Sequence, residues 1–316
     1  MREERVTFFS EGEKVAGILR LPDAQGAAPY PAIVQGPGWL QVKEAKRNPP
    51  YHEAFTAAGF AVLIIDFRGF GESEGDRRDL LPQRWIDDLV NAVTYLTTRE
   101  DIDSARIGTF GSGSTGGGNA VLLPAVDPRV RASVAQLPIA DGADWLRRMR
   151  RGYEWYEFVA RVEADARDRV LTGEGAMVHP RKDLMVVTPV REEREAKDAA
   201  SNQPVQHVED VSLRSAAAIM AYRPIDAAPK VRALLVIAVA DDPVTPTDHA
   251  QALYDAAQEP KKLIIQSDTT HYVAYEQYAD IVIPQMVDWF RTHLTSGPVG
   301  VWEQTLDGAT YRTVEQ

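Results

Sequence analysis

A run rich in glycine and serine between Phe110 and Gly118 holds the residues best suited to nucleophilic chemistry. A nucleophile elbow places a serine on a strained turn from strand to helix, and only small residues two positions before and after it fit that turn. Ser114 has Ser112 before it and Gly116 after it, whereas Ser112 has the large Phe110 two positions earlier. We therefore predict that Ser114 is the nucleophile. The alternatives are a glycine-rich phosphate-binding loop and a plain turn.

A second serine, Ser73, lies in the pentapeptide GESEG and fits the elbow pattern literally. Charged residues follow it at positions 76–78, and no apolar helix begins there. Its hydroxyl would therefore not be held at a helix N-terminus. We expect Ser73 to lie in a loop.

A serine nucleophile needs a general base, and His271 is the best-placed of the six histidines. It follows the last expected core strand, and a loop beyond the carboxyl end of a strand can bring an imidazole to the serine. A lone loop histidine can also be exposed and idle. The remaining histidines are expected in surface helices (His52, His293), in the middle segment (His179, His207) and in a helix near the acid (His249).

The acid that orients the imidazole is expected in the loop after the preceding strand, where Asp241 and Asp242 occur. Asp242 is preferred because Pro243 and Val244 after it form a rigid loop. Asp241 could instead cap the next helix. No histidine or third carboxylate is placed near this pair, so no metal site is predicted.

The oxyanion of an acyl-transfer reaction needs backbone N–H donors. Thr115, just after the predicted nucleophile, supplies one at a helix N-terminus. The second is expected from the loop after residues 32–35. Pro37 has no N–H, so Gly38 or Trp39 must provide it. A plain turn is the alternative for this glycine–proline sequence.

The elements that position these residues alternate between buried strands and amphipathic helices, which predicts an α/β fold with a mostly parallel sheet. A charged N-terminal strand pair precedes them. The expected strands are residues 6–9, 15–21, 32–35, 60–66, 106–111, 130–137, 233–240 and 262–266, and the expected helices are residues 51–58, 85–97, 119–126, 248–258 and 283–294.

The alternation stops between residues 139 and 223, where apolar residues recur at helical spacing over residues 145–171. We expect residues 139–223 to form a helical cap inserted into a core of residues 1–138 and 224–296, with a tail at 297–316. The cap should roof a mostly apolar, drug-sized substrate pocket. Its aromatic residues Trp145, Tyr153, Trp155 and Tyr156 are the candidate pocket residues.

Composition excludes several classes of function. The 316 residues carry 35 Lys plus Arg and 46 Asp plus Glu, a formal charge of −11, which disfavours binding to nucleic acid or an anionic membrane. Cysteine is absent, so disulfides and thiolate chemistry are excluded. The charged N-terminus does not resemble a signal peptide, and no apolar run approaches the ~20 residues of a membrane span. We expect a cytoplasmic protein without a cofactor, and a homodimer is compatible with the sequence.

The chain order Ser114, Asp242, His271 on alternating strands and helices resembles the serine branch of the α/β-hydrolase superfamily. The resemblance spans residues 5–138 and 224–295, and the strand pair and large cap are most similar to dienelactone-hydrolase-like enzymes and carbon–carbon bond hydrolases. The chain departs from the family pattern at Ser112 and Val239, where glycine is usual, and at Gln35, where histidine is usual. A serine at the elbow argues against dehalogenases and most epoxide hydrolases, which use aspartate there.

This resemblance implies a serine hydrolase that acts on a small or medium carboxylic ester, thioester or lactone through an acyl-enzyme on Ser114. One alternative is hydrolysis of an amide, or of a carbon–carbon bond next to a ketone, by the same three residues. Another is a binding protein that keeps the fold without catalysis.

Overall fold

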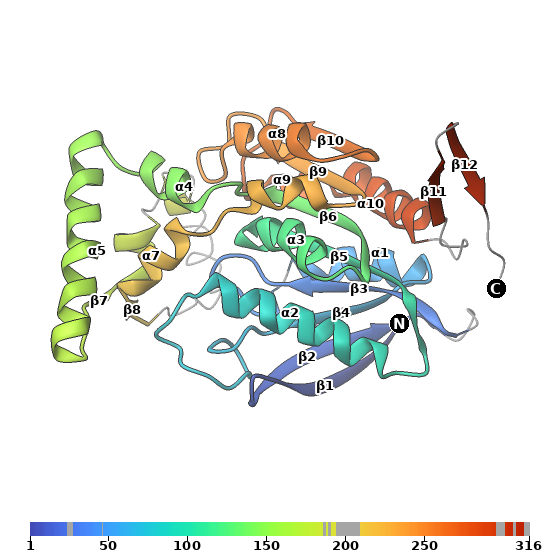
Figure 1. Cartoon of the computed structure of the whole chain (residues 1–316), viewed down its shortest axis with the longest axis horizontal. Coiled ribbons are helices and arrows are strands. Elements are labelled where there is room, and N and C mark those ends of the chain that lie inside the picture. Colours follow the sequence, from blue (N-terminus) through green and yellow to red (C-terminus); the bar gives the residue numbers. More distant parts are fainter. Residues whose placement is uncertain are drawn as a thin grey trace.

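An eight-stranded sheet forms the centre of the protein in a computed structural model of the chain (Figure 1). The structure describes residues 1–23, 28–45, 47–185, 188, 191–193, 209–294, 301–305 and 308–312, the last two segments by their backbone.

The order of the strands in the sheet confirms the predicted α/β class. The first two strands form an antiparallel hairpin at one edge, β2 pairs antiparallel with β4, and all later pairs are parallel. The carboxyl ends of the parallel strands therefore meet at one edge of the sheet, where loops can bring side chains together. From one side to the other the strands are β1 (Arg2–Ser10), β2 (Glu13–Leu21), β4 (Ala61–Ile65), β3 (Tyr30–Gly36), β5 (Ile102–Ser114), β6 (Val130–Pro138), β9 (Leu234–Val239) and β10 (Lys261–Gln266).

Helices cover both faces of the sheet because successive strand residues point to opposite sides (Figure 1). Ile33 packs in a cluster with α1 (Asn48–Ala57) and α10 (Ala279–His293), while its neighbour Val34 packs in a cluster with α2 (Pro82–Thr97). Both side chains are fully buried. The remaining helices of the core are α3 (Thr115–Val126), α8 (Thr247–Ala256), α9 (Ala274–Gln277) and the 3₁₀ turns η2 (Pro224–Asp226) and η3 (Ala228–Lys230).

The segment between β6 and β9 lies outside this sheet, and α5 stands at the end of the molecule (Figure 1). The helical spacing over residues 145–171 belongs to two helices. The backbone is extended at Arg151, whose N–H donates to Glu154 at 2.7 Å and so caps the second helix. The segment also contains a short strand pair. Its elements are α4 (Gly142–Arg148), α5 (Gly152–Thr172), β7 (Met177–Val178), the π-helix η1 (Pro180–Leu184), β8 (Val211–Ser212) and α7 (Arg214–Met220).

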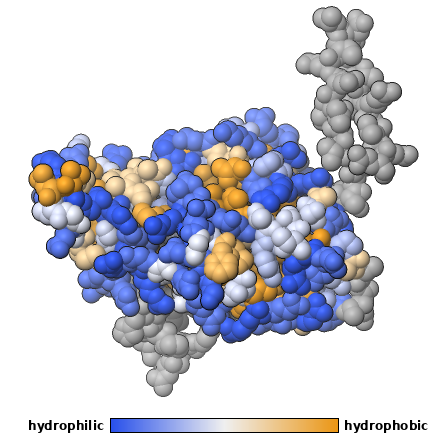
Figure 2. All heavy atoms as spheres, turned by 60° about the horizontal axis from the view of Figure 1, so that its bottom comes forward, coloured by the Kyte–Doolittle hydropathy of each residue, from blue (hydrophilic) through white to orange (hydrophobic). Residues whose placement is uncertain are grey.

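The expected C-terminal tail contains a hairpin that the sequence reasoning did not predict. Strands β11 (Val301–Thr305) and β12 (Gly308–Arg312) pair antiparallel. Within the described ranges, no helix is both long enough and apolar enough to cross a bilayer. The face shown in Figure 2 is largely hydrophilic, with one group of apolar side chains at the end where α5 lies and others over the middle of the molecule.

His52 is fully buried, so the expectation of a surface position was wrong. Its helix α1 packs against β2 and β3, where the two ring nitrogens contact Arg20 and Gln35. Since the Arg20 guanidinium can only donate, Nδ1 accepts from it and Nε2–H donates to Gln35. Burial, reinforced by the Arg20 charge, lowers the pKa of His52 to about 3.

This buried neutral imidazole should make stability depend on pH. An unfolded imidazole takes up a proton below about pH 6.5, whereas folded His52 resists protonation down to about 3. Protons therefore favour the unfolded chain, and stability is lost as the pH falls through this window. We expect the free energy of unfolding of the wild type to fall by up to ~1.4 kcal/mol per pH unit more than that of His52→Gln. Urea denaturation between about pH 7 and pH 5 measures both slopes; equal slopes would contradict the assignment.

Candidate active site

Ser114 lies at the junction of β5 and α3 in a strained backbone conformation, with φ 45° and ψ −105°. This left-handed φ is unusual for a non-glycine residue and is typical of a nucleophile elbow. The strand end and the helix start approach so closely that a Cβ on Gly111 would fall 1.9 Å from the carbonyl oxygen of Gly116. Glycine is therefore required at position 111. The elbow pattern asks for a small residue two positions before the nucleophile, and the serine at position 112 meets that requirement.

Asp242 and His271 come from the loops after β9 and β10 and meet at the carboxyl edge of the sheet. Asp242 Oδ2 lies 2.7 Å from His271 Nδ1, and both residues are buried. Because the carboxylate can only accept, Nδ1 carries the proton and Nε2 is left as the basic nitrogen. Asp241, the other candidate, is exposed.

Thr245 helps to hold the Asp242 carboxylate, a role that sequence reasoning missed. Its hydroxyl donates to Oδ2 at 2.7 Å, and the N–H groups of Val244 and Thr245 donate to Oδ1 at 2.8 and 3.2 Å. Burial alone would raise the pKa of Asp242, but the His271 charge and these hydrogen bonds outweigh it and lower the pKa below its usual value. The available signal was the Asp-x-x-Thr spacing, since such a turn satisfies an aspartate locally.

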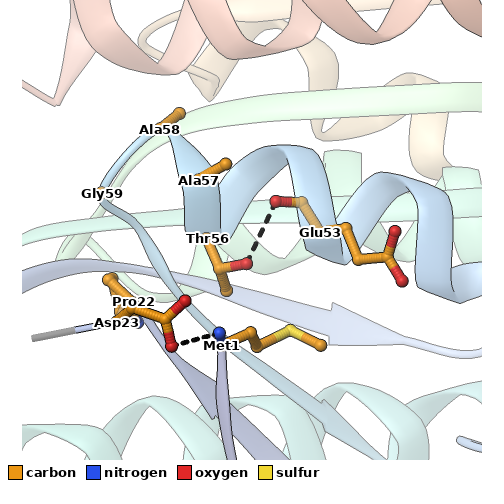
Figure 3. A pocket seen from close by; sticks show the side chains of 8 residues that line it. All are labelled: Met1, Pro22, Asp23, Glu53, Thr56, Ala57, Ala58 and Gly59. Atoms are coloured by element: carbon orange, nitrogen blue, oxygen red, sulfur yellow. Dashed lines mark hydrogen bonds and ion pairs between the residues drawn. The ribbon is translucent and has the colours of Figure 1, made fainter.

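Ser114 and His271 line one small cavity of about 30 Å³. The loop after β3 contributes Trp39 and Gln41 to the same cavity. A larger cavity of about 600 Å³ lies where β1 begins and β2 ends; Met1, Asp23, Glu53 and Thr56 line it, and its described lining residues do not pair a nucleophile with a base (Figure 3). The smaller cavity is therefore the candidate active site.

The loop expected to supply the second oxyanion donor packs directly on the elbow. A Cβ on Gly38 would fall 2.5 Å from the carbonyl oxygen of Ser112, and a Cβ on Gly116 would fall 3.0 Å from Gly38 Cα. Only a glycine allows this approach. Thr115 is the first residue of α3, so its N–H has no partner within the helix.

A buried ion pair fixes this loop to the loop after β4, and sequence reasoning missed it. Lys43 Nζ lies 2.7 Å from Asp66 Oδ2, both side chains have no exposure, and the Lys43 N–H donates to Asp66 Oδ1 at 2.7 Å. Burial would lower the pKa of Lys43, but hydrogen bonds to Asp66, Glu72 and Glu44 raise it, so the ammonium stays charged. The pair restrains the chain that carries Gly38 and Trp39.

Ser73 lies in the expected loop, and its hydroxyl is used structurally. It donates to the Asp66 carbonyl at 2.7 Å and accepts from the Ala16 N–H at 2.8 Å. With both hydrogen bonds satisfied in a buried site, Ser73 does not compete with Ser114 as a nucleophile.

The comparison with protein families agrees with this arrangement. The model of the X-Pro dipeptidyl-peptidase (S15) family matches residues 11–272. The chain belongs to the S15 family. It is a hydrolase of the α/β-hydrolase type.

Relatives of this S15-family protein include an uncharacterized 31.7 kDa protein in the traX-finO intergenic region of Escherichia coli, 31% identical over 92% of this chain and 100% of the relative. The thiohydrolase aneE of Aspergillus aculeatus is 37% identical over 42% of this chain and 40% of its own length. Among solved structures, the α/β hydrolase GrgF from Penicillium sp. sh18 has a TM-score of 0.77 at 20% identity, covering 93% of this chain and 99% of that one. These similarities place the fold among the α/β hydrolases.

The structure does not bring the four predicted cap aromatic residues into the cavity. Tyr153 and Tyr156 are 58% and 76% exposed because they lie on the outer face of α5. Trp155 packs against Phe158 at 6.0 Å between ring centroids. Trp145 is fully buried behind the cavity, where its Nε1–H donates to the Val244 carbonyl at 2.8 Å.

The cavity is small, about 30 Å³, and its wall is rich in arginine, so the expectation of a mostly apolar, drug-sized pocket was wrong. Arg181 and Arg191 of the middle segment and Arg47 of the core line it together with Met185 and Tyr272. Within the part of the chain that the structure describes, no three His, Asp or Glu side chains gather as metal ligands.

Proposed function

We propose that this protein is a serine hydrolase of small carboxylic esters, thioesters or lactones, with Ser114, His271 and Asp242 as the reacting set. The observation that carries the proposal is the buried Asp242–His271 pair beside a strained serine in one cavity. We assign residues 1–138 and 224–296 to the catalytic core and residues 139–223 to a cap that limits the substrate space.

The proposed reaction proceeds through an acyl-enzyme. His271 Nε2 takes the proton of Ser114 Oγ as the oxygen attacks the carbonyl carbon. The N–H of Thr115, together with that of Trp39 or Gly38, stabilises the negative oxygen of the tetrahedral intermediate. His271 then returns the proton to the departing alcohol or thiol. Water, activated by the same imidazole, attacks the acyl group and releases the acid and free Ser114.

Two considerations favour oxygen and sulfur esters as substrates. The matched relative aneE is described as a thiohydrolase. The cavity of about 30 Å³ is no larger than the space one water molecule takes in the liquid, so it favours the smallest acyl groups. Amide hydrolysis is the second candidate, because the matching family takes its name from a peptidase. A screen of matched esters, thioesters, lactones and amides of one small acid separates these possibilities.

Labelling by a fluorophosphonate probe tests whether the site is catalytic at all. The probe reacts with an activated serine but not with a serine lacking a general base. We expect stoichiometric labelling of the wild type at Ser114, identified by peptide mass spectrometry, and no labelling of His271→Ala. An unlabelled but folded wild type would favour a binding protein.

A further inference from the structure

The cavity beside Ser114 is positively charged although the protein as a whole is strongly acidic. The formal charge of the chain is −11. Three arginines line the cavity, and none of its described lining residues is acidic. A local field of opposite sign to the net charge selects the charge of the molecule that enters.

Arg47 lies against the elbow that carries Ser114. Its Nη2 would lie 3.0 Å from a Cβ on Gly113 and 3.0 Å from a Cβ on Gly38, so the guanidinium sits over the elbow and the expected oxyanion loop. The guanidinium also stacks over the Tyr275 ring at 4.5 Å from its centroid. This stacking fixes its plane at the cavity wall.

The guanidinium of Arg47 has no charged partner among the residues that the structure describes. Nη2 donates to Gln41 Oε1 and, at 3.4 Å, to the Ser112 carbonyl, while Nε is buried without any acceptor. Among the described residues no carboxylate lies within ion-pair distance of Arg47. A buried guanidinium N–H without an acceptor is destabilising, and an incoming anion would satisfy it.

Arg181 and Arg191, both from the middle segment, add two further arginines to the wall of the same cavity. Arg181 is only 9% exposed, and the Arg191 guanidinium lies 5.5 Å from the centroid of the Tyr272 ring. Burial raises the pKa of Tyr272, and the charges of both arginines oppose that rise. Both positive charges therefore act on the Tyr272 ring, which lines the cavity together with His271.

We propose that the substrate carries a carboxylate close to the scissile carbonyl, and that Arg47 binds this carboxylate. The inference rests on the proposed function and names its substrate class: monoesters or monothioesters of small dicarboxylic acids. A planar carboxylate matches the fork of a guanidinium, and such charge-assisted pairs are short and directional. Arg47 and Ser114 line the same small cavity, so a carboxylate bound by Arg47 would lie only a few atoms from the carbonyl.

Two matched aryl esters test the proposal. Mono-4-nitrophenyl fumarate carries the carboxylate, and methyl 4-nitrophenyl fumarate masks it as a neutral ester. The trans double bond prevents the carboxylate from attacking its own ester. We expect the wild type to hydrolyse the anionic ester with a kcat/KM at least about 100-fold higher than that of the neutral ester, after correction for the uncatalysed rates.

Arginine variants assign the preference to Arg47. Arg47→Gln should lower kcat/KM for the anionic ester by about 100-fold more than it lowers that for the neutral ester. Arg47→Lys, which keeps the charge but loses the fork, should fall between them. Arg291→Gln, on the exposed face of α10, is the matched control and should leave both rates unchanged. Arg191→Gln should reduce the preference without removing it, which keeps a second test if Arg47→Gln does not fold.

Competition identifies the anion. Fumarate should inhibit hydrolysis of the neutral ester, while inorganic phosphate at equal ionic strength should not; stronger inhibition by phosphate would overturn the carboxylate assignment. A wild type that hydrolyses the neutral ester equally well, or an Arg47→Gln variant that loses both activities equally, would also overturn it while leaving the proposed function intact. No hydrolysis of either ester and no fluorophosphonate labelling would instead refute the proposed function.

Discussion

Ser114→Ala should lower kcat by about 10⁴-fold or more, with the fold unchanged. Ser114 lies on a strained turn, and alanine would remove the proposed attacking oxygen but few packing contacts. The residual rate should come from the backbone donors alone. Ester hydrolysis under saturating substrate and circular dichroism measure the two quantities.

Two neighbouring serines serve as controls for this prediction. Ser112→Ala should keep kcat within a few-fold of wild type, because Ser112 contributes its backbone carbonyl to the contacts with Gly38 and Arg47. Ser73→Ala should cost about 1–3 kcal/mol of stability through two lost buried hydrogen bonds but keep activity per folded molecule. If Ser112→Ala is inactive while Ser114→Ala retains activity, the nucleophile has been misassigned.

Asp242→Asn should lower kcat by roughly 10⁴-fold, because an amide no longer favours the His271 tautomer with the proton on Nδ1. The imidazole would turn its N–H toward Ser114 and lose its capacity as a base. Asp241→Asn is the matched control on an exposed carboxylate and should change kcat by less than about threefold. Equal losses in the two variants would leave the acid unassigned.

The lowered pKa of Asp242 sets the pH range in which its buried carboxylate contributes to stability. Its ionised form, and the stability that this form contributes, are present above the usual pKa of about 3.9 and are lost only as the pH falls through the lower folded value. Urea denaturation of the wild type and of Asp242→Asn at several pH values should therefore show a stability difference that shrinks only below about pH 3.9. A difference that shrinks at higher pH would contradict the lowered pKa.

Much of the fold could be predicted because the parallel strands are buried on both faces. Such strands are continuous apolar runs, as in residues 60–66, and they stand out between amphipathic helices. The chain order of a serine, an acid and a base after successive strands then placed Ser114, Asp242 and His271 at one edge. Strand β5 extends past its apolar part to Ser114 because the small residues after Phe110 allow the close approach to α3.

What escaped prediction depends on contacts between distant segments. Lys43 and Asp66 are ordinary surface residue types, and only the parallel pairing of β3 with β4 brings their loops together. The arginines of the cavity come from separate segments whose meeting no local pattern reports. The prediction that aromatic residues of α5 line the pocket was wrong, because hydrophobic spacing identifies one face of a helix but not the part of the protein that covers this face.

The first helix of the middle segment is attached to the core at several points. Trp145 donates to the Val244 carbonyl at 2.8 Å, and His249 bridges the Ala140 N–H at 3.1 Å and the Asp144 carboxylate at 2.8 Å. Arg148 adds an ion pair to Asp248 at 2.7 Å. A rotation of the middle segment about Ile139 would break all these contacts together. It would leave the buried indole N–H of Trp145 without an acceptor, at a free-energy cost of about 1–3 kcal/mol for that group alone. Helix α4 is therefore expected to stay fixed relative to the core. Substrate and product are expected to pass through the part of the cavity wall that Arg181 and Arg191 form.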